Sequence, residues 1–152
     1  MIDALDAAGL LARFAALHPV AATGMGFHDH DGSWGANGPA GRAARLDWCD
    51  REEGRLIAIP VASLSADDLC DRDLALGTIR AIRFELQEVQ PEAWDALHTV
   101  SVIGGGLFPL IARGFGTAER RASDLASRLA AVPDLLDAAI VDLTGLPELR
   151  VP

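Results

Sequence analysis

Two histidines and two aspartates follow one another directly at residues 28–31, in the order His-Asp-His-Asp. Imidazole and carboxylate groups bind metal ions and transfer protons near neutral pH. His28 and His30 share one side of the backbone only where it is extended, and a neighbouring aspartate could then orient an imidazole. Zinc needs three or four protein ligands, so His18, His98 or a distant carboxylate would have to join. The alternative is a solvated turn with exposed imidazoles, and the sequence favours this turn over a metal site.

The other motifs predict no further site. Gly104 to Gly106 lack the Lys-Ser/Thr of a phosphate-binding loop and the spacing of a dinucleotide fingerprint, so they indicate close helix packing or a helix break. No serine lies in a G-x-S-x-G turn. The four aspartates between residues 67 and 73 lack the glycine turn of a calcium loop and suit the first turn of a helix. We therefore expect no metal and no cofactor in this chain.

The charge balance argues against nucleic acid as a partner. The sequence has 13 basic residues, all arginine, against 22 acidic residues, and its formal net charge is −9. Binding a phosphate backbone needs a basic face, and only Arg120 and Arg121 are adjacent basic residues.

The N-terminal segment is acidic where a secretory signal is positive, and no stretch reaches the roughly eighteen apolar residues of a membrane span. These features predict a cytoplasmic protein without a membrane partner.

Hydrophobic spacing predicts helices in the first half of the chain. Residues 3–17 form an amphipathic helix with Asp3 as its N-cap, and His18 and Pro19 end the pattern. Residues 24–41 are rich in glycine and predict a long loop. Residues 41–59 favour a helix, with a short strand near its end as the alternative. Ser65 caps the next helix, whose expected buried face is Ala75, Ile79, Ile82, Leu86 and Val89.

Hydrophobic spacing and capping residues also predict the elements in the second half of the chain. Residues 100–115 are apolar and interrupted by the three glycines, and we expect them to be buried whatever their secondary structure. Thr117 caps a further helix, in which Asp124 and Arg128 form an acid-base pair four residues apart. Pro133 suits the first position of a last helix, whose expected inner face is Leu136, Ala139, Ile140 and Leu143.

These elements predict an all-α fold, an irregular helical bundle with one long glycine-rich loop. Four or five amphipathic helices without a hairpin signal make this the most economical architecture. The length of 152 residues suits a single helical domain over residues 1–152. Cys49 and Cys70 lack the spacing of a zinc knuckle or redox motif, so we expect reduced thiols inside helices.

Three segments together resemble a known family. Their order and spacing are similar to the N-terminal portion of the bacterial family of unknown function DUF885. The matching residues are Pro19, Ala22, Thr23, Gly26, His28 and Asp31 in the first segment, Asp71, Arg72 and Leu74 in the second, and Arg113, Phe115, Arg121, Arg128, Leu129, Pro133, Leu136 and Ala139 in the third.

This resemblance implies a function that the chain does not perform alone. Members of the family are longer, largely helical and similar to zinc metallopeptidases, with a His-Glu-x-x-x-Gly-His helix in their C-terminal part. No histidine here precedes a glutamate, so zinc and its chemistry belong to a C-terminal part if one is present. The implied role is a helical scaffold or cleft wall, the N-terminal part of a longer metallopeptidase-like protein, whose substrate-cleft candidates are Thr23, His28, His30 and Asp31.

The resemblance and the composition leave two functions open. In the first, the partner is the remainder of a metallopeptidase-like protein, and the substrate is peptide-like. In the second, this is a small stand-alone helical protein that binds a helical partner, with the region of Gly104 to Gly106 as the contact. A large exposed apolar patch favours the first hypothesis, and a closed polar surface favours the second.

Overall fold

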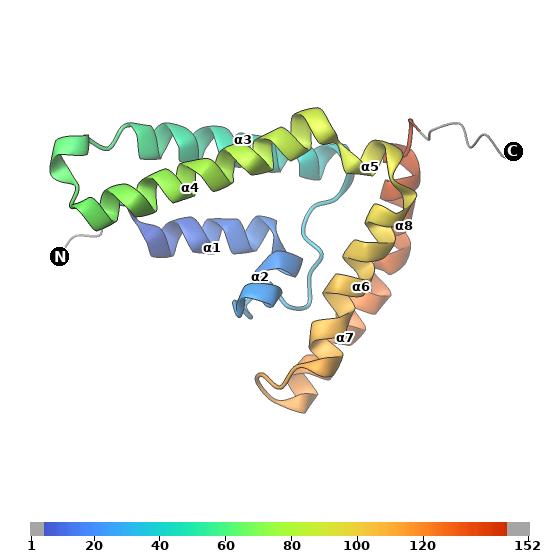
Figure 1. Cartoon of the computed structure of the whole chain (residues 1–152). Helices are drawn as coiled ribbons and strands as arrows, with labels where there is room; N and C mark the ends of the chain where they lie inside the picture. The colour runs from blue at the N-terminus through green and yellow to red at the C-terminus, as the bar shows by residue number, and fades with distance from the viewer. Residues whose placement is uncertain (1–4, 146–152) are drawn as a thin grey trace, which may run out of the picture.

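The computed structural model describes residues 5–145, and in this part of the chain every element is helical. Two arms meet at a corner (Figure 1). The first arm contains α1 (Ala7–Leu17), α3 (Gly38–Ile57) and α4 (Ala66–Phe84). The second contains α6 (Ala96–Ala112), α7 (Ala118–Ala130) and α8 (Val132–Asp142). The short elements are α2 (Pro19–Met25), η1 (Val61–Ser63), η2 (Glu85–Val89) and α5 (Pro91–Trp94).

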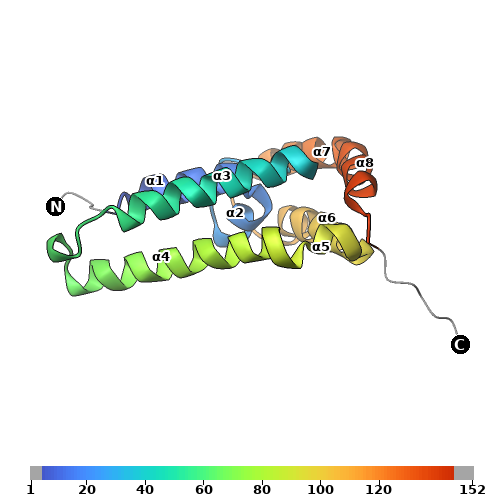
Figure 2. The same ribbon diagram turned by 90° about the horizontal axis from the view of Figure 1, so that it is seen from above.

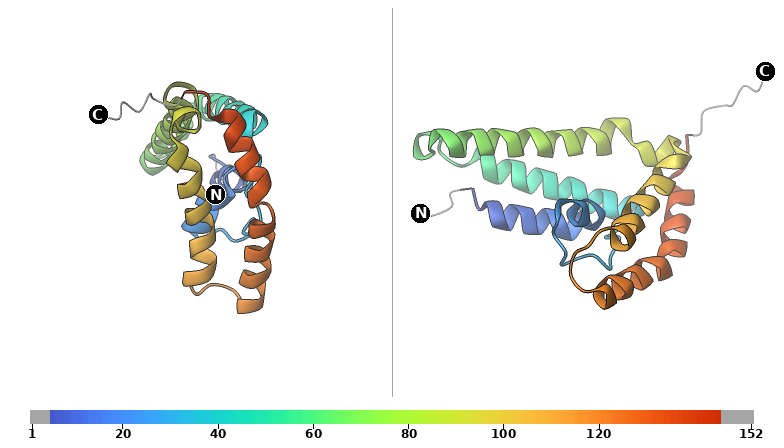
Figure 3. Two further views of the ribbon diagram at one scale, coloured as in Figure 1. Left: turned by 90° about the vertical axis from the view of Figure 1, so that its right-hand side faces the viewer. Right: turned by 60° about the horizontal axis from the view of Figure 1, so that its bottom comes forward.

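The views from other directions show how the arms are built. Helices α3 and α4 run antiparallel with α1 alongside them (Figure 2). In the second arm, α7 and α8 return along α6, so the arm has two legs (Figure 3). Helix α2 and the loop that follows it occupy the inside of the corner. The all-α irregular bundle predicted from the sequence is confirmed.

The helix caps lie where the sequence places them. The Ser65 hydroxyl accepts a hydrogen bond from the Asp68 amide, and the Asp68 carboxylate accepts one from the Ser65 amide, which completes a capping box. The Thr117 hydroxyl accepts from the Arg120 amide at the start of α7. Each cap satisfies an amide that the helix itself leaves unpaired, which stabilises a helix by about 1 kcal/mol.

The first arm has an apolar core. Cys49 packs there without access to solvent, whereas Cys70 on α4 is exposed, and both are free thiols within helices. Burial raises the pKa of the Cys49 thiol, which keeps it protonated and inert. The buried members of this core are Leu5, Trp48, Cys49, Leu56, Leu76 and Ile79.

Several predicted boundaries are wrong. Pro19 ends the pattern of α1 but also opens α2, because proline suits a first helical turn, where an amide has no partner. The predicted loop 24–41 is therefore shorter, from Gly26 to Asn37, and α3 begins at Gly38. The favoured helix over residues 41–59 is confirmed and the alternative strand is wrong. The predicted N-cap Asp3 lies outside the described residues.

Helix α6 differs most from its prediction. It continues without a break through Gly104 to Gly106, and the expectation that residues 100–115 are buried is wrong. One face of α6 is exposed: Leu97 is 70% exposed, Val100 59%, Phe108 64% and Ile111 66%. An apolar helix that lies against a single layer buries only one side, so hydrophobicity all round does not guarantee burial. We call Leu97, Val100, Phe108 and Ile111 the α6 face.

Helix α8 is rotated relative to its predicted face. Leu135 is buried, whereas Ile140 is 73% exposed. Leu136 is also exposed, so only part of the predicted inner face points inward.

Among the described residues, no single helix is long and apolar enough to cross a membrane; the segment Ala66–Trp94 passes that test only together with Ala96–Ala112, at a bend of 104°.

Candidate functional site

The His-Asp-His-Asp segment lies in the loop between α2 and α3, against the second arm. Gly32 faces Asp124 and Ser127 of α7, and Trp34 covers Gly106 of α6. The loop thus fills the inside of the corner (Figure 3). Its conformation depends on contacts with helices that follow it by some seventy to ninety residues, which explains why sequence patterns alone could not place it.

Asp31 organises this loop. Its side chain is 2% exposed, and both of its oxygens have partners. The Thr23 hydroxyl lies 2.6 Å from Asp31 Oδ1, and His28 Nδ1 lies 2.9 Å from Asp31 Oδ2. The His28 ring stacks on Phe115, with 3.8 Å between the ring centroids. Three of the four candidates, Thr23, His28 and Asp31, therefore form one hydrogen-bonded group.

The fourth candidate, His30, lies apart from this group. Its side chain is half-buried within the turn formed by residues 29–32, and the Ser33 amide donates to its backbone carbonyl. His30 therefore shapes the turn through its backbone. His28 and His30 are the candidates that keep some contact with solvent, whereas Thr23 and Asp31 are buried.

Arg128 anchors the group from α7 and is the largest fully buried side chain, with 0% exposure. Its Nε donates to the Ser33 carbonyl over 3.1 Å, one terminal nitrogen donates to the Gly106 carbonyl, and the other donates to the Thr23 hydroxyl over 3.0 Å. Burial lowers the pKa of this guanidinium, and the negative charges of Asp31 and Asp124 oppose that effect. Because arginine stays protonated in proteins, Arg128 remains a buried cation held by hydrogen bonds.

The predicted Asp124–Arg128 pair is wrong in its geometry. Asp124 Oδ2 lies 3.7 Å from Arg120 Nε, and Arg128 points inward instead. The Trp34 indole donates to the Arg128 carbonyl over 2.8 Å and also lies against its guanidinium. Sequence spacing missed this role, although Arg128 follows the half-buried Leu125 by three residues, the spacing of neighbours on one helix face.

A small hollow of about 190 Å³ opens beside His28. Arg120 and Arg121 border it, and an Arg121 terminal nitrogen donates to the Phe115 carbonyl over 2.7 Å. The full lining is His28, Asp29, Asp31, Phe115, Gly116, Arg120, Arg121 and Asp124. Two arginines and three aspartates thus line the hollow, and the arginines can donate hydrogen bonds to carboxylate or carbonyl oxygens.

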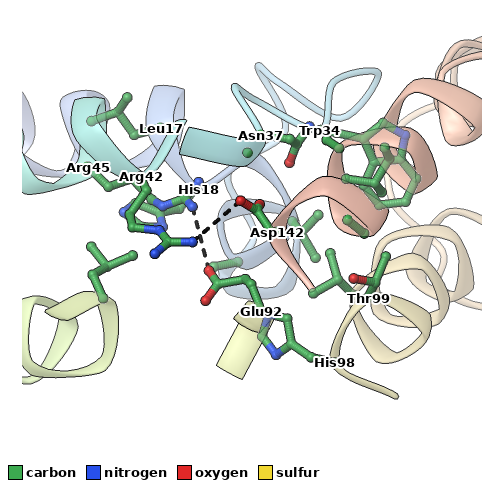
Figure 4. A pocket seen from close by; sticks show the side chains of 18 of the residues that line it. Leu17, His18, Trp34, Asn37, Arg42, Arg45, Glu92, His98, Thr99 and Asp142 are labelled. Carbon is green, nitrogen blue, oxygen red and sulfur yellow. Dashed lines mark ion pairs between the residues drawn. The ribbon is translucent and has the colours of Figure 1, made fainter. Parts of the chain in front are cut away.

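A larger cavity of about 400 Å³ lies between the two arms (Figure 4). Two ion pairs cross it: Arg42 lies 3.5 Å from Asp142, and Arg45 lies 3.8 Å from Glu92. His18 and His98 line this cavity and do not line the hollow beside His28. Burial, helped by the positive charge of Arg45, lowers the pKa of His18 to about 4, so this imidazole is neutral at pH 7.

The geometry bears on metal binding as well. Within residues 5–145, no three side chains of histidine, cysteine, aspartate or glutamate converge in a way that could hold a metal ion. His18 and His98 would have been the nearest additional imidazole ligands in the sequence, but they face the larger cavity. The chemistry available at the loop is hydrogen bonding and charge, supplied by His28 and the two neighbouring arginines.

Comparisons with known proteins agree with the sequence resemblance. A solved structure described as "a putative lipoprotein of unknown function from Shewanella oneidensis" superposes with a TM-score of 0.81 at 20% sequence identity, over 89% of this chain and 24% of that one. This chain thus spans about a quarter of the length of that protein. No curated protein matches significantly. The family described as "Bacterial protein of unknown function (DUF885)" matches residues 19–150, and the chain therefore belongs to that family.

Proposed function

We propose that this chain is the N-terminal helical scaffold of a longer metallopeptidase-like protein, that it forms one wall of the substrate cleft, and that it is not catalytic alone. In this proposal, zinc and the groups that activate water belong to the remainder of the protein. This chain supplies shape and polar contacts to a peptide-like substrate.

The exposed α6 face carries the proposal. Four large apolar side chains that are each more than half exposed lie on one side of a helix without a charged residue. Soluble chains rarely leave so continuous an apolar surface in water, since covering it is favourable by about 25 cal/mol for each Å². The Shewanella oneidensis protein, of which this chain matches 24%, has ample further chain to cover such a face.

The cleft wall is the hollow beside His28. Asp31 and Thr23 are buried and fix the loop, so their proposed role is to position the wall. His28 is half-buried and lines this hollow, whereas His30 is half-buried in the adjacent turn formed by residues 29–32. Arg120 and Arg121 line the hollow together with three aspartates and can donate hydrogen bonds to the carbonyl or carboxylate oxygens of a peptide. We expect His28 and His30 to influence substrate affinity, not zinc binding.

A cysteine-labelling experiment tests whether the remainder of a longer protein covers the α6 face. Phe108→Cys is introduced together with Cys70→Ser, because Cys70 is exposed and would react itself. In the isolated chain, a polar maleimide reagent should label residue 108 rapidly. In the intact native product, the rate should fall by about tenfold or more, because the cysteine reacts only after local opening. Ser123→Cys on the exposed side of α7 is the matched control and should react equally in both.

Measuring the mass of the intact native product shows whether a longer protein exists whose remainder could cover the α6 face. A product that is longer than residues 1–152, protects residue 108 and contains a His-Glu-x-x-x-Gly-His helix supports the proposal. A product limited to this chain contradicts it, and protection of residue 108 by a separate protein would then favour the stand-alone partner-binding function. Equal labelling in a longer product would show that its remainder does not pack on α6, which also contradicts the proposal.

A further inference from the structure

The three consecutive glycines of α6 have different surroundings. A Cβ on Gly106 would lie 2.3 Å from the Trp34 ring, so this chain itself requires glycine at that position. A Cβ on Gly104 or Gly105 would meet nothing within 4 Å. Glycine is the least favourable residue inside a helix after proline, since it loses the most backbone freedom. The packing of this chain therefore explains one of the three glycines and leaves two without a local reason.

Gly104 lies in the middle of the α6 face. The exposed apolar residues and Gly104 occur at positions 97, 100, 104, 108 and 111, with steps of three or four residues that place them along one side of a helix. Gly105 lies at the edge of the same side. The surface thus has a shallow gap at its centre, bordered by Val100, Phe108 and the exposed Ser101.

From this arrangement we propose that Gly104 is the point at which an apolar helix of the remaining DUF885 polypeptide crosses α6 at close range. A residue without a side chain lets two helix backbones approach, while the large side chains on either side pack around the crossing helix. This inference rests on the proposed scaffold function. It specifies that a helix of the longer protein touches this chain, and that it does so at Gly104.

The length of the solved relative and the composition of α6 indicate what kind of helix covers the α6 face. This chain corresponds to 24% of the solved relative, whose remaining chain is long enough to supply a helix. Residues 96–112 contain no aspartate, glutamate, lysine or arginine, so the face offers no ion-pair partner and selects an apolar helix. Gly54 in α3 and Gly77 in α4 are also open positions, so open space alone does not mark Gly104; its place at the centre of the α6 face does.

Substitution at Gly104 should have opposite effects in the two forms of the protein. In the isolated chain, Gly104→Ala and Gly104→Leu should each raise the thermal midpoint by about 2–4 °C, because the added side chain points into open space and favours the helix. In the intact native product, Gly104→Leu should lower the midpoint, because the side chain collides with the crossing helix. Gly77 on α4 also has nothing within 4 Å and is the matched control: Gly77→Leu should raise the midpoint in both forms.

The outcomes separate this inference from the scaffold proposal. A lowered midpoint for Gly104→Leu, with a raised midpoint for Gly77→Leu in the same product, supports the crossing at Gly104. An unchanged or raised midpoint for Gly104→Leu, while residue 108 stays protected from labelling, overturns the crossing and leaves the scaffold proposal standing. If residue 108 is freely labelled in the native product, or if that product ends at this chain, both are overturned.

Discussion

Arg128 and Thr23 are 105 residues apart in sequence, yet the guanidinium donates to the threonine hydroxyl over 3.0 Å in the interior of the protein. The contact joins α7 to α2, and the other two donors of Arg128 reach the loop at Ser33 and α6 at Gly106. One buried cation therefore fixes four segments relative to one another. The Thr23 hydroxyl contacts both Arg128 and Asp31, so it links the buried cation of α7 to the carboxylate of the loop.

Replacing Arg128 should destabilise the whole fold. Arg128→Met removes the donors to the buried Gly106 carbonyl and Thr23 hydroxyl and to the partly buried Ser33 carbonyl, and each buried group left unsatisfied costs about 1–3 kcal/mol. We expect the free energy of unfolding to fall by roughly 3–5 kcal/mol, a large part of the stability of an ordinary domain. Urea denaturation followed by circular dichroism measures this loss.

Two further variants make the result specific. Arg128→Lys keeps the charge but not the fork of donors, so its loss should be intermediate. Arg120→Met removes a neighbouring arginine whose side chain is 63% exposed, and it should change the free energy of unfolding by less than about 0.5 kcal/mol. Equal effects at positions 120 and 128 would show that the buried network does not hold the loop.

The same network shows what sequence patterns can and cannot predict. The caps at Ser65 and Thr117 were predicted because a cap is a contact across three residues. The position of Arg128 was not, because its partners lie up to 105 residues away. Hydropathy likewise identified α6 as apolar, but it could not say whether this chain or another part of a protein covers that helix. The family resemblance included Thr23, Asp31 and Arg128 without indicating that Asp31 and Arg128 both contact Thr23.

Gly106 should be intolerant of even the smallest side chain. A Cβ there would lie 2.3 Å from Trp34, whose indole is held by its hydrogen bond to the Arg128 carbonyl. Gly106→Ala should lower the free energy of unfolding by about 1–3 kcal/mol, because overpacking outweighs the gain in helix propensity. The near-ultraviolet circular dichroism of Trp34 should change with it. Gly77→Ala, which meets open space, should be neutral or stabilising, and the same loss at both positions would refute the steric explanation.

Glu52 should stabilise the first arm through its charge. Burial opposes its ionisation, but hydrogen bonds from Arg13 and Arg55 outweigh that effect and lower its pKa below 4.5. Arg13 donates to Oε2 over 3.1 Å and Arg55 donates to it over 2.8 Å. Glu52→Gln should therefore lower the free energy of unfolding at pH 7 by about 1–3 kcal/mol.

The effect of Glu52 should depend on pH with a definite sign. A carboxyl whose pKa is lower in the folded state stabilises the protein above its unfolded pKa, and that contribution disappears as the pH falls through the folded pKa. The difference between wild type and Glu52→Gln should thus shrink below pH 4.5. Asp47→Asn removes an exposed ion pair with Arg51 and should change stability little at any pH. A difference that persists unchanged into acid would exclude charge as the cause.

His18 should make the protein less stable in mild acid. Burial and the charge of Arg45 lower its pKa from 6.5 to about 4, so between these values the unfolded chain binds a proton that the folded chain does not. Protonation then favours the unfolded state, and the free energy of unfolding should fall as the pH drops from 6.5 to 4, by at most about 3 kcal/mol. His18→Gln should lose less over this interval, although it is less stable at pH 7 because the ring no longer stacks on Phe14. Comparing each protein with itself at the two pH values cancels the packing loss. Comparing the two pH-dependent losses with each other then cancels the titration of the carboxylates, which both proteins share. An identical loss in both proteins would mean that the cavity admits enough water to hold the charged imidazole.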